Sequence, residues 1–320
     1  MRAIVLSQFG PPSELVPADV PDPVPGPGQV VVAVEAASIT FVETQVRSGR
    51  PPHPSMSPTL PIVPGNGVGG VVAAVGPDVD ASWTGRRVVT TTGGSGGYAE
   101  RVAVRAEDLI EVPAGLALRD ATALLADGRT ALALMDAAAI HAGETVLVEA
   151  AAGGVGTLLV QLARNAGATV VAAAGGSRKL ALAAELGANV VADYTTADWA
   201  ERVQAQAGHV DVIFDGVGGA VGLAAFGLLR DGGRYCTFGM ASGEFARISD
   251  EAAASRGITL LRGVPVSPER MRGLSRRALD AAASGTLRPV IGQTFPLSAA
   301  ADAHAAIESR ATVGKTLLLV

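Results

Sequence analysis

The chain has 320 residues, 48% of them hydrophobic, and a formal net charge of −5 at pH 7. This length suits about two domains of roughly 100–200 residues each. No basic run offers the electrostatic footprint of nucleic-acid or anionic-membrane binding, and no apolar run approaches the roughly 20 residues of a membrane span. Cys236 is the single cysteine, which excludes an intrachain disulfide and a thiolate metal cluster. We therefore expect a cytoplasmic protein with a small-molecule partner.

Short β-branched or alternating runs dominate the first third of the chain, at residues 30–36, 69–75 and 87–92. Segments rich in proline and glycine separate them, which indicates a β-rich domain with irregular loops. From residue 144 onward, apolar runs such as "TVLVEA", "TVVAAA" and "VDVIFDG" alternate with segments of helical length. This alternation predicts a parallel sheet with helices on both faces.

The last part of the chain contains one amphipathic helix and a closing strand, "GKTLLLV". These pieces are too small to fold alone, so we predict that they rejoin the first domain. The predicted division is one domain from residues 1–119 and 264–320, and a second from residues 120–263.

A glycine-rich turn follows the first strand of the alternating region. The stretch "VEAAAGGVGTLL" places Gly153 and Gly156 between a buried strand and an amphipathic helix, with Ala151 at the first glycine position of the dinucleotide fingerprint. Gly153 would let a pyrophosphate approach the backbone, and Gly156 would let helix and strand pack closely. The helix N-terminus would then attract the anion. A turn without any ligand is the alternative.

The segment about 20 residues further on carries basic residues instead of an acid. An NAD-binding unit places Asp or Glu there to bind the ribose hydroxyls, but this chain reads "AAAGGSRK". Cations at a helix N-terminus are locally unfavourable, and a 2′-phosphate would reverse that penalty. Lys179 and Lys315 are the only lysines in a chain that otherwise uses arginine, which marks both as candidates, with solvated surface residues as the alternative.

Several motifs together resemble one enzyme family. The runs "VLVEAAAGGVGTLLVQLARNAGA", "GGYAE", "GRTALAL", "VDVIFDGVGG", "GRYCTFG" and "ESRATVGKTLLLV" are similar to the zinc-independent quinone oxidoreductases, the zeta-crystallin-like branch of the medium-chain dehydrogenases/reductases. The resemblance extends over nearly the whole chain. It implies an α/β fold with a doubly wound Rossmann domain and a GroES-like β-rich catalytic domain, NADPH as cofactor, and a homodimer that pairs through the last Rossmann strand, residues 258–261.

The resemblance also implies cofactor contacts at Thr130, at 153–155, around the 2′-phosphate, and at Val217, Phe238 and Gly239. Tyr194 and Arg310, assigned to the phosphate, have ordinary alternatives as a strand-end aromatic and a surface cation. The predicted cofactor-binding residues are therefore Thr130, Ala152, Gly153, Gly154, Val155, Gly156, Gly176, Ser177, Lys179, Tyr194, Val217, Phe238, Gly239, Arg310 and Lys315.

The metal ligands of the zinc-bearing relatives are absent. Those relatives have a cysteine near residues 39–40 and a His-Glu pair where this chain has Asn66 and Gly67. The four histidines are widely scattered, so no metal-ligand spacing remains, and we predict no metal.

The expected substrate segment also departs from the family. It reads "TFVETQVRSG", with Gln45 where the family commonly has a tyrosine. No residue here is a convincing general acid near neutral pH, so we expect water to protonate the product. The candidate catalytic residues are Thr40, Gln45, Arg47, Asn66 and Asp127, and Asp127 could instead start a helix.

These features predict an NADPH-dependent, metal-free oxidoreductase that transfers a hydride to quinones or activated enones. Without a Lewis acid, the acceptor must itself delocalise the incoming charge. One alternative is an enoyl or 2-alkenal reductase of the same superfamily, and another is a non-catalytic NADPH-binding structural or regulatory protein.

Overall fold

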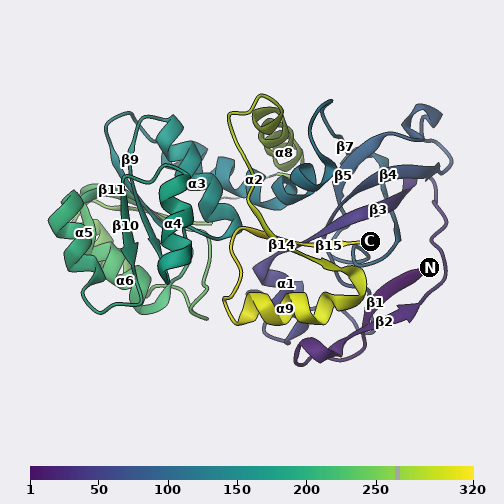
Figure 1. Cartoon of the computed structure of the whole chain (residues 1–320), viewed down its shortest axis with the longest axis horizontal. Helices are drawn as coiled ribbons and strands as arrows, with labels where there is room; N and C mark the ends of the chain where they lie inside the picture. The colour runs from purple at the N-terminus through teal and green to yellow at the C-terminus, as the bar shows by residue number, and fades with distance from the viewer. Residues whose placement is uncertain (264–266) are drawn as a thin grey trace. The chain divides into compact units, whose positions relative to one another are not determined.

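The computed structural model describes residues 1–263 and 267–320, which form two compact units (Figure 1). The first contains Met1–Gly128 and Ser275–Val320, and the second contains Arg129–Leu274. The units divide inside helices α2 (Leu118–Ala138) and α8 (Pro268–Ala283). The predicted border between residues 119 and 120 also lies in α2, nearer its start, and the predicted border at residue 264 lies outside the described residues. Among the described residues, no helix has the length and apolar character to cross a membrane.

The first unit contains a seven-stranded sheet in the order β14-β15-β3-β4-β5-β7, with β6 also paired to β3. Strand β3 has the sequence QVVVAVEAASI, and its valines and all of its alanines except Ala33 are buried, on both faces of the strand. The last strand of the chain, β15, pairs antiparallel with β3, Thr316 opposite Ile39. The sheet strands are β3 (Gln29–Ile39), β4 (Gly67–Val75), β5 (Arg87–Thr91), β6 (Arg101–Arg105), β7 (Ile110–Glu111), β14 (Ile291–Pro296) and β15 (Lys315–Leu319).

Smaller elements complete this unit. Strands β1 (Arg2–Leu6) and β2 (Leu15–Asp19) form a separate antiparallel pair. Helices α1 (Phe41–Arg47) and α9 (Ala300–Glu308) contact each other. Segments from the N-terminal and the C-terminal parts of the chain therefore pack in one unit.

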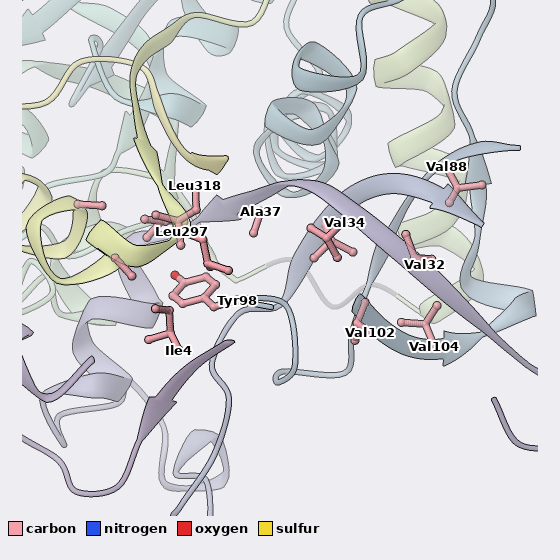
Figure 2. Close-up of a cluster of buried hydrophobic side chains, with 14 of the residues drawn as sticks. Ile4, Val32, Val34, Ala37, Val88, Tyr98, Val102, Val104, Leu297 and Leu318 are labelled. Atoms are coloured by element: carbon pink, nitrogen blue, oxygen red, sulfur yellow. The ribbon is translucent and has the colours of Figure 1, made fainter. Parts of the chain in front are cut away.

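Tyr98 lies at the centre of that core, among side chains from β1, β3 and the C-terminal segment (Figure 2). Its hydroxyl is 3.0 Å from Nε2 of His304, and neither residue is exposed. Burial lowers the pKa of His304 to about 3, so this histidine is neutral at physiological pH. The pair is a packed polar contact and not a metal site.

The second unit contains a six-stranded parallel sheet in the order β10-β9-β8-β11-β12-β13. Helix α3 contacts β8 and β9, and helix α4 contacts β9 and β10. Helices α5 and α6 pack in one hydrophobic cluster with Leu147, Val171 and Ile213, which lie on the same face of the sheet. This doubly wound arrangement confirms the predicted α/β fold. Its elements are β8 (Thr145–Glu149), α3 (Gly154–Asn165), β9 (Thr169–Ala174), α4 (Ser177–Glu185), β10 (Val190–Asp193), α5 (Trp199–Ala207), β11 (Val210–Asp215), α6 (Gly219–Leu228), β12 (Leu229–Thr237), α7 (Asp250–Ser255) and β13 (Thr259–Arg262).

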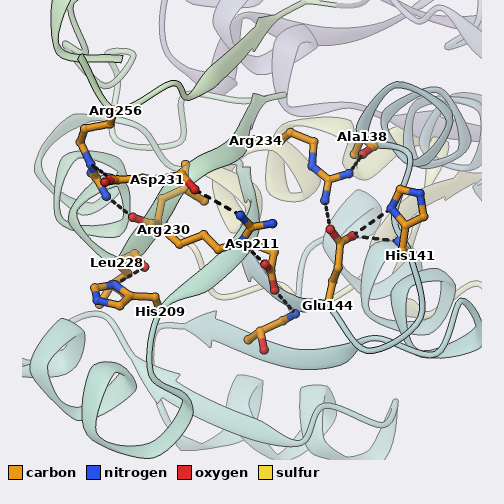
Figure 3. A network of polar contacts seen from close by, with 12 residues as sticks. Ala138, His141, Glu144, His209, Asp211, Leu228, Arg230, Asp231, Arg234 and Arg256 are labelled. Carbon is orange, nitrogen blue, oxygen red and sulfur yellow. Dashed lines mark hydrogen bonds and ion pairs between the residues drawn. The ribbon is translucent and has the colours of Figure 1, made fainter. Parts of the chain in front are cut away.

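Ion pairs join the elements at the amino-terminal edge of this sheet (Figure 3). Arg234 of β12 donates to Glu144, just before β8, and to the Ala138 carbonyl at the end of α2. Asp211 of β11 accepts from Arg230 and from the Thr145 amide. These contacts fix the starts of the strands. Ligands of doubly wound sheets bind at the opposite edge, where the carboxyl ends of the strands lie.

Arg47, predicted as a substrate ligand, has structural contacts in the first unit. Its side chain is only 2% exposed, and its guanidinium donates to the Gly10 carbonyl and the Glu308 carboxylate. These contacts join α1 to α9 and to the loop after β1. Its Nε has no hydrogen-bond partner among the described residues, and its predicted contact with a substrate oxygen stays a prediction.

We expect Arg47→Met to destabilise the protein by about 3 kcal/mol, because it leaves a carboxylate and a carbonyl without their donor. Urea unfolding of the whole chain measures this loss. Arg50→Met is the matched control, since Arg50 is exposed, and it should change stability little. Equal stability of the two variants would contradict the structural role.

Candidate functional site

The turn between β8 and α3 is built for close approach of a ligand to the backbone. Gly153 is the N-cap of α3 and has no side chain to cap the helix, while residues 153–155 are partly exposed. Ala152 and Gly156 are buried beneath them. A Cβ at Gly156 would lie 2.2 Å from the Ala150 carbonyl oxygen, so only glycine fits there. This geometry agrees with the predicted packing role of Gly156, and the approach of a pyrophosphate at Gly153 stays a prediction.

The same turn favours an anion. The first N–H groups of a helix have no partner within the helix, and its dipole places partial positive charge at this end. The first turn of α3 contains no acidic residue that would compete. The backbone of residues 153–156 therefore fits the pyrophosphate of a dinucleotide.

A second turn lies at the end of the neighbouring strand β9. Gly176, with φ of +88°, is the N-cap of α4, and a Cβ at this position would meet no atom within 4 Å. Ser177 is exposed and Lys179 is half-buried in the first turn of α4. A Cβ at Gly175 would lie 3.4 Å from the Tyr194 ring, so Tyr194 borders this turn. The structure thus brings Gly176, Ser177, Lys179 and Tyr194 together, whereas the exposed Arg310 belongs to the other unit.

Asp193 borders the second turn and was missed by the sequence analysis. Its Oδ2 accepts from the Gly176 amide at 3.1 Å, and its Oδ1 accepts from the amide and hydroxyl of Thr195. The hydrogen bonds from Thr195, the hydroxyl first, lower the pKa of this carboxyl, so it is ionised at neutral pH. The only signal in the sequence is its position at the end of "NVVAD". This carboxylate adds negative charge where a phosphate would bind.

A cavity of about 770 Å³ lies in the second unit, beside the end of β12. Thr130 and Phe238, both predicted, contribute to its wall. Arg129 and Phe245 contribute too and were missed, because nothing in their local sequence marks them. The lining residues are Arg129, Thr130, Ala133, Leu134, Thr237, Phe238, Phe245, Ala246, Arg262, Gly263, Met271 and Leu274. Aromatic and aliphatic walls with a few polar groups suit a planar organic molecule.

Asp215 organises the two loops near this cavity. Its Oδ1 accepts from the amides of Val217 at 2.9 Å and Gly218 at 2.7 Å. Its own carbonyl accepts from the Phe238 amide at 2.8 Å and from Gly239 at 3.3 Å. A Cβ at Gly239 would lie 2.8 Å from the Gly216 carbonyl oxygen, so these loops touch. The predicted residues Val217, Phe238 and Gly239 are therefore held together by one buried acid.

Two of the candidate catalytic residues, Thr40 and Asn66, contact the same carboxyl group in the first unit, that of Glu43. Glu43 Oε2 accepts from the Thr40 amide at 2.5 Å and from the Thr40 hydroxyl at 3.0 Å, while Oε1 accepts from the Asn66 amide at 2.9 Å. Burial, against these hydrogen bonds and the charge of Lys315, raises the pKa of Glu43. Glu43 was not among the predicted site residues. Thr40 and Asn66 thus lie together around a carboxyl group.

Asp127 and Lys315 form a buried ion pair, with Oδ1 and Nζ 2.9 Å apart. Lys315 is buried, so the alternative that it is a solvated surface residue is wrong. Its predicted contact with the cofactor and the catalytic role of Asp127 stay predictions. Asp127 lies in the middle of α2, so the helix-start alternative is also wrong. The pair joins α2 to the start of β15.

Gln45 lies in α1 and is half-buried. Its carbonyl accepts from the Arg50 amide and the Ser48 hydroxyl, which fixes the end of the helix. Its predicted contact with the substrate stays a prediction.

Residues 1–263 and 267–320 contain no group of three or more His, Cys, Asp or Glu side chains placed to hold a metal ion. The absence of metal from the purified protein stays a prediction from the missing ligand spacing.

We expect Asp127→Asn and Lys315→Met each to cost about 3 kcal/mol, because each leaves one buried charge without its partner. The double variant should recover part of that loss, since neither charge remains. Urea unfolding of the four proteins measures the coupling. Additive losses would mean that the two groups do not stabilise each other.

Comparisons with known proteins agree with this architecture. Residues 26–114 match a family described as alcohol dehydrogenase GroES-like domain, and residues 186–318 match one described as zinc-binding dehydrogenase. A 2-haloacrylate reductase from Burkholderia sp is 33% identical over 100% of this chain and 99% of its own. Quinone oxidoreductase from Sus scrofa is 33% identical over 100% and 98%. The structure of Escherichia coli quinone oxidoreductase complexed with NADPH superposes with a TM-score of 0.91 at 28% identity, covering 100% of both chains. The chain belongs to the quinone oxidoreductase family of the medium-chain dehydrogenase/reductase superfamily.

Proposed function

We propose that this protein is an NADPH-dependent reductase that transfers a hydride to quinones or other electron-poor conjugated carbonyl compounds. The observation that carries the proposal is the pair of turns at the carboxyl ends of β8 and β9. One turn presents uncapped helix N–H groups to a pyrophosphate, and the other has Lys179 where an NAD-specific enzyme has an acid. The relatives named as reductases, and one solved with NADPH, support the same reading.

The residues of this chain have separate tasks in that reaction. Residues 153–156 bind the pyrophosphate, and Ser177, Lys179 and Tyr194 bind the 2′-phosphate. Asp215 fixes the loops of Val217 and Phe238 beside the nicotinamide. NADPH, when bound, supplies the hydride. The largely apolar cavity beside Thr130 excludes water and orients a planar acceptor, so positioning provides most of the rate.

The class of hydride acceptor follows from how the acceptor accommodates the negative charge of the added hydride. Quinones and 2-haloacrylates, after which two relatives are named, both have conjugated systems that spread the charge of an added hydride. Such acceptors need no Lewis acid, which suits a chain without the spacing of zinc ligands. Water supplies the proton. An enoyl or 2-alkenal reductase remains the alternative within the family, because its substrates share this conjugation.

The assembly is also part of the proposal. Strand β13 is the outer strand of the parallel sheet, and it has one partner, β12, among the described residues. An open edge of this kind can pair with the same strand of a second copy. We therefore propose a homodimer through residues 258–261, in the cytoplasm.

A screen of acceptors tests the reaction. We expect steady NADPH oxidation with 1,4-benzoquinone or 9,10-phenanthrenequinone, unchanged after treatment with EDTA, and none with saturated ketones. Enals and enoyl thioesters in the same screen identify the alternative reductase. NADPH binding without oxidation by any acceptor would instead indicate a binding protein, and loss of activity with EDTA would contradict the metal-free reaction.

Cofactor choice tests the second turn. Charge-assisted hydrogen bonds contribute roughly 1.5–3 kcal/mol each, so NADPH should bind at least about tenfold more tightly than NADH. Lys179→Ala should remove most of this preference by weakening NADPH alone. Asp193→Asn should increase it, since a negative charge near the phosphate disappears.

Fluorescence titration of NADPH and NADH with wild type, Lys179→Ala and Asp193→Asn measures the dissociation constants that these expectations compare. Arg164→Ala is the control, because Arg164 is an exposed cation at the far end of the neighbouring helix α3. Equal losses for NADPH and NADH in Lys179→Ala would show that this lysine does not bind the phosphate.

A further inference from the structure

Glu149, the last residue of β8, is a buried acid with no task in the mechanism above. The side chain is 0% exposed, and no N–H or O–H donor of the described residues reaches either carboxyl oxygen. A buried polar group without a partner costs free energy, so its presence requires an explanation.

A second buried acid lies next to it. Asp215 is the last residue of β11, is also 0% exposed, and follows the register pair Phe214 and Val148 of β11 and β8. The residues after a register pair in parallel strands lie side by side on one face. Glu149 and Asp215 therefore face each other at the carboxyl edge of the sheet.

This position is the one where the strand order reverses. The chain adds β9 and β10 on one side of β8, and then β11, β12 and β13 on the other. Ligands of doubly wound sheets bind at such a switch point. Glu149 leads directly into the pyrophosphate turn, and Asp215 leads into the loop of Val217 and Gly218.

The surroundings keep one proton on the pair. Burial, and then the adjacent Asp215 carboxyl, raises the pKa of Glu149 well above its usual value. The other titratable group that faces the pair is Tyr235 of β12, whose hydroxyl is 2.8 Å from Asp215 Oδ2 and 3.0 Å from the Gly222 carbonyl of α6. Burial raises the pKa of Tyr235 far out of the physiological range, so it stays neutral. On the side of Glu149 away from Asp215, its register partner in β9 is the uncharged Ala173. No cation of residues 1–263 or 267–320 contributes to the pKa shift of Glu149, so none offsets a second charge on the pair.

We propose that Glu149 is a positioning residue for the cofactor: its neutral carboxyl lies against the Asp215 carboxylate, and this contact holds the Val217–Gly218 loop in its binding shape. Asp215 needs both of its contacts in place, since its side chain holds that loop and its carbonyl holds Phe238. When Glu149 loses its proton to solvent, two buried negative charges repel each other and the loop loosens. The part that concerns NADPH rests on the proposed function, whereas the part that concerns the acid pair does not.

Unfolding of the cofactor-free protein tests the acid pair. Glu149 is protonated in the folded chain and ionised in the unfolded chain above its usual pKa, so stability should fall as pH rises from 5 toward the folded pKa. One bound proton changes the unfolding constant by about tenfold per pH unit. Glu149→Gln removes this dependence, so its melting temperature relative to wild type should increase steadily with pH.

The control is Glu185→Gln, the same change at an exposed glutamate of α4, which should leave the pH dependence of wild type intact. A constant difference between Glu149→Gln and wild type across pH 5 to 9 would overturn the inference. Glu149→Met serves as a second variant if the glutamine protein does not fold, because it also removes the charge and predicts the same lost pH dependence.

Titration of NADPH across the same pH range tests the positioning. The dissociation constant of wild type should rise on the alkaline side more than that of Glu149→Gln, and Glu149→Met should bind more weakly at every pH, because it cannot donate to Asp215. Identical pH profiles for wild type and Glu149→Gln would refute the positioning role. Failure of every protein to bind NADPH would refute the proposed function instead, and the unfolding experiment would still decide on the acid pair.

Discussion

The close approach of α3 to the end of β8 is the constraint on which the nucleotide-binding unit depends. At Gly156 the helix is so near the Ala150 carbonyl that any side chain would collide with it. This contact directs the first turn of α3 toward the carboxyl edge of the sheet and leaves residues 153–155 accessible. The backbone N–H groups at the start of α3 can then donate to a ligand, a task that side chains perform in many other binding sites. A site made of backbone has little dependence on the identity of its side chains, which suits a family with many substrates.

Buried charge is the second organising feature, and it differs between the units. In the first unit the buried ions are paired: Arg47 with Glu308, and Lys315 with Asp127. Such pairs contribute little net stability, but each ion is costly once its partner is removed. They join segments far apart in the sequence, since α1 meets α9 and α2 meets β15. In the second unit Glu149 and Asp215 are buried, neither forms an ion pair among the described residues, and burial raises the pKa of Glu149.

The two turns of the second unit place opposing charges around the adenosine end of a cofactor. Asp193 accepts from the Gly176 amide, and Lys179 lies in the first turn of the adjoining helix α4. In the proposed function these two residues, 14 positions apart in the chain, have opposite effects on a bound phosphate. The proposed preference for NADPH is then a difference between two local charges and not a property of one motif.

The sequence by itself determined the alternation of strands and helices, the glycine turn and the family, because each rests on local periodicity or on short motifs. Thr130 and Phe238, expected at a site from motif positions of the family, line the cavity of the second unit, and their cofactor contacts stay a prediction. Only the tertiary structure decided which charged residues meet. Asp127 was a candidate catalytic residue and Lys315 a candidate cofactor residue, and folding joins the two over 188 positions. Glu43, Asp193 and the Glu149–Asp215 pair were missed for the same reason: an acid gains its role from what packs against it, and that depends on the pairing of strands distant in the sequence.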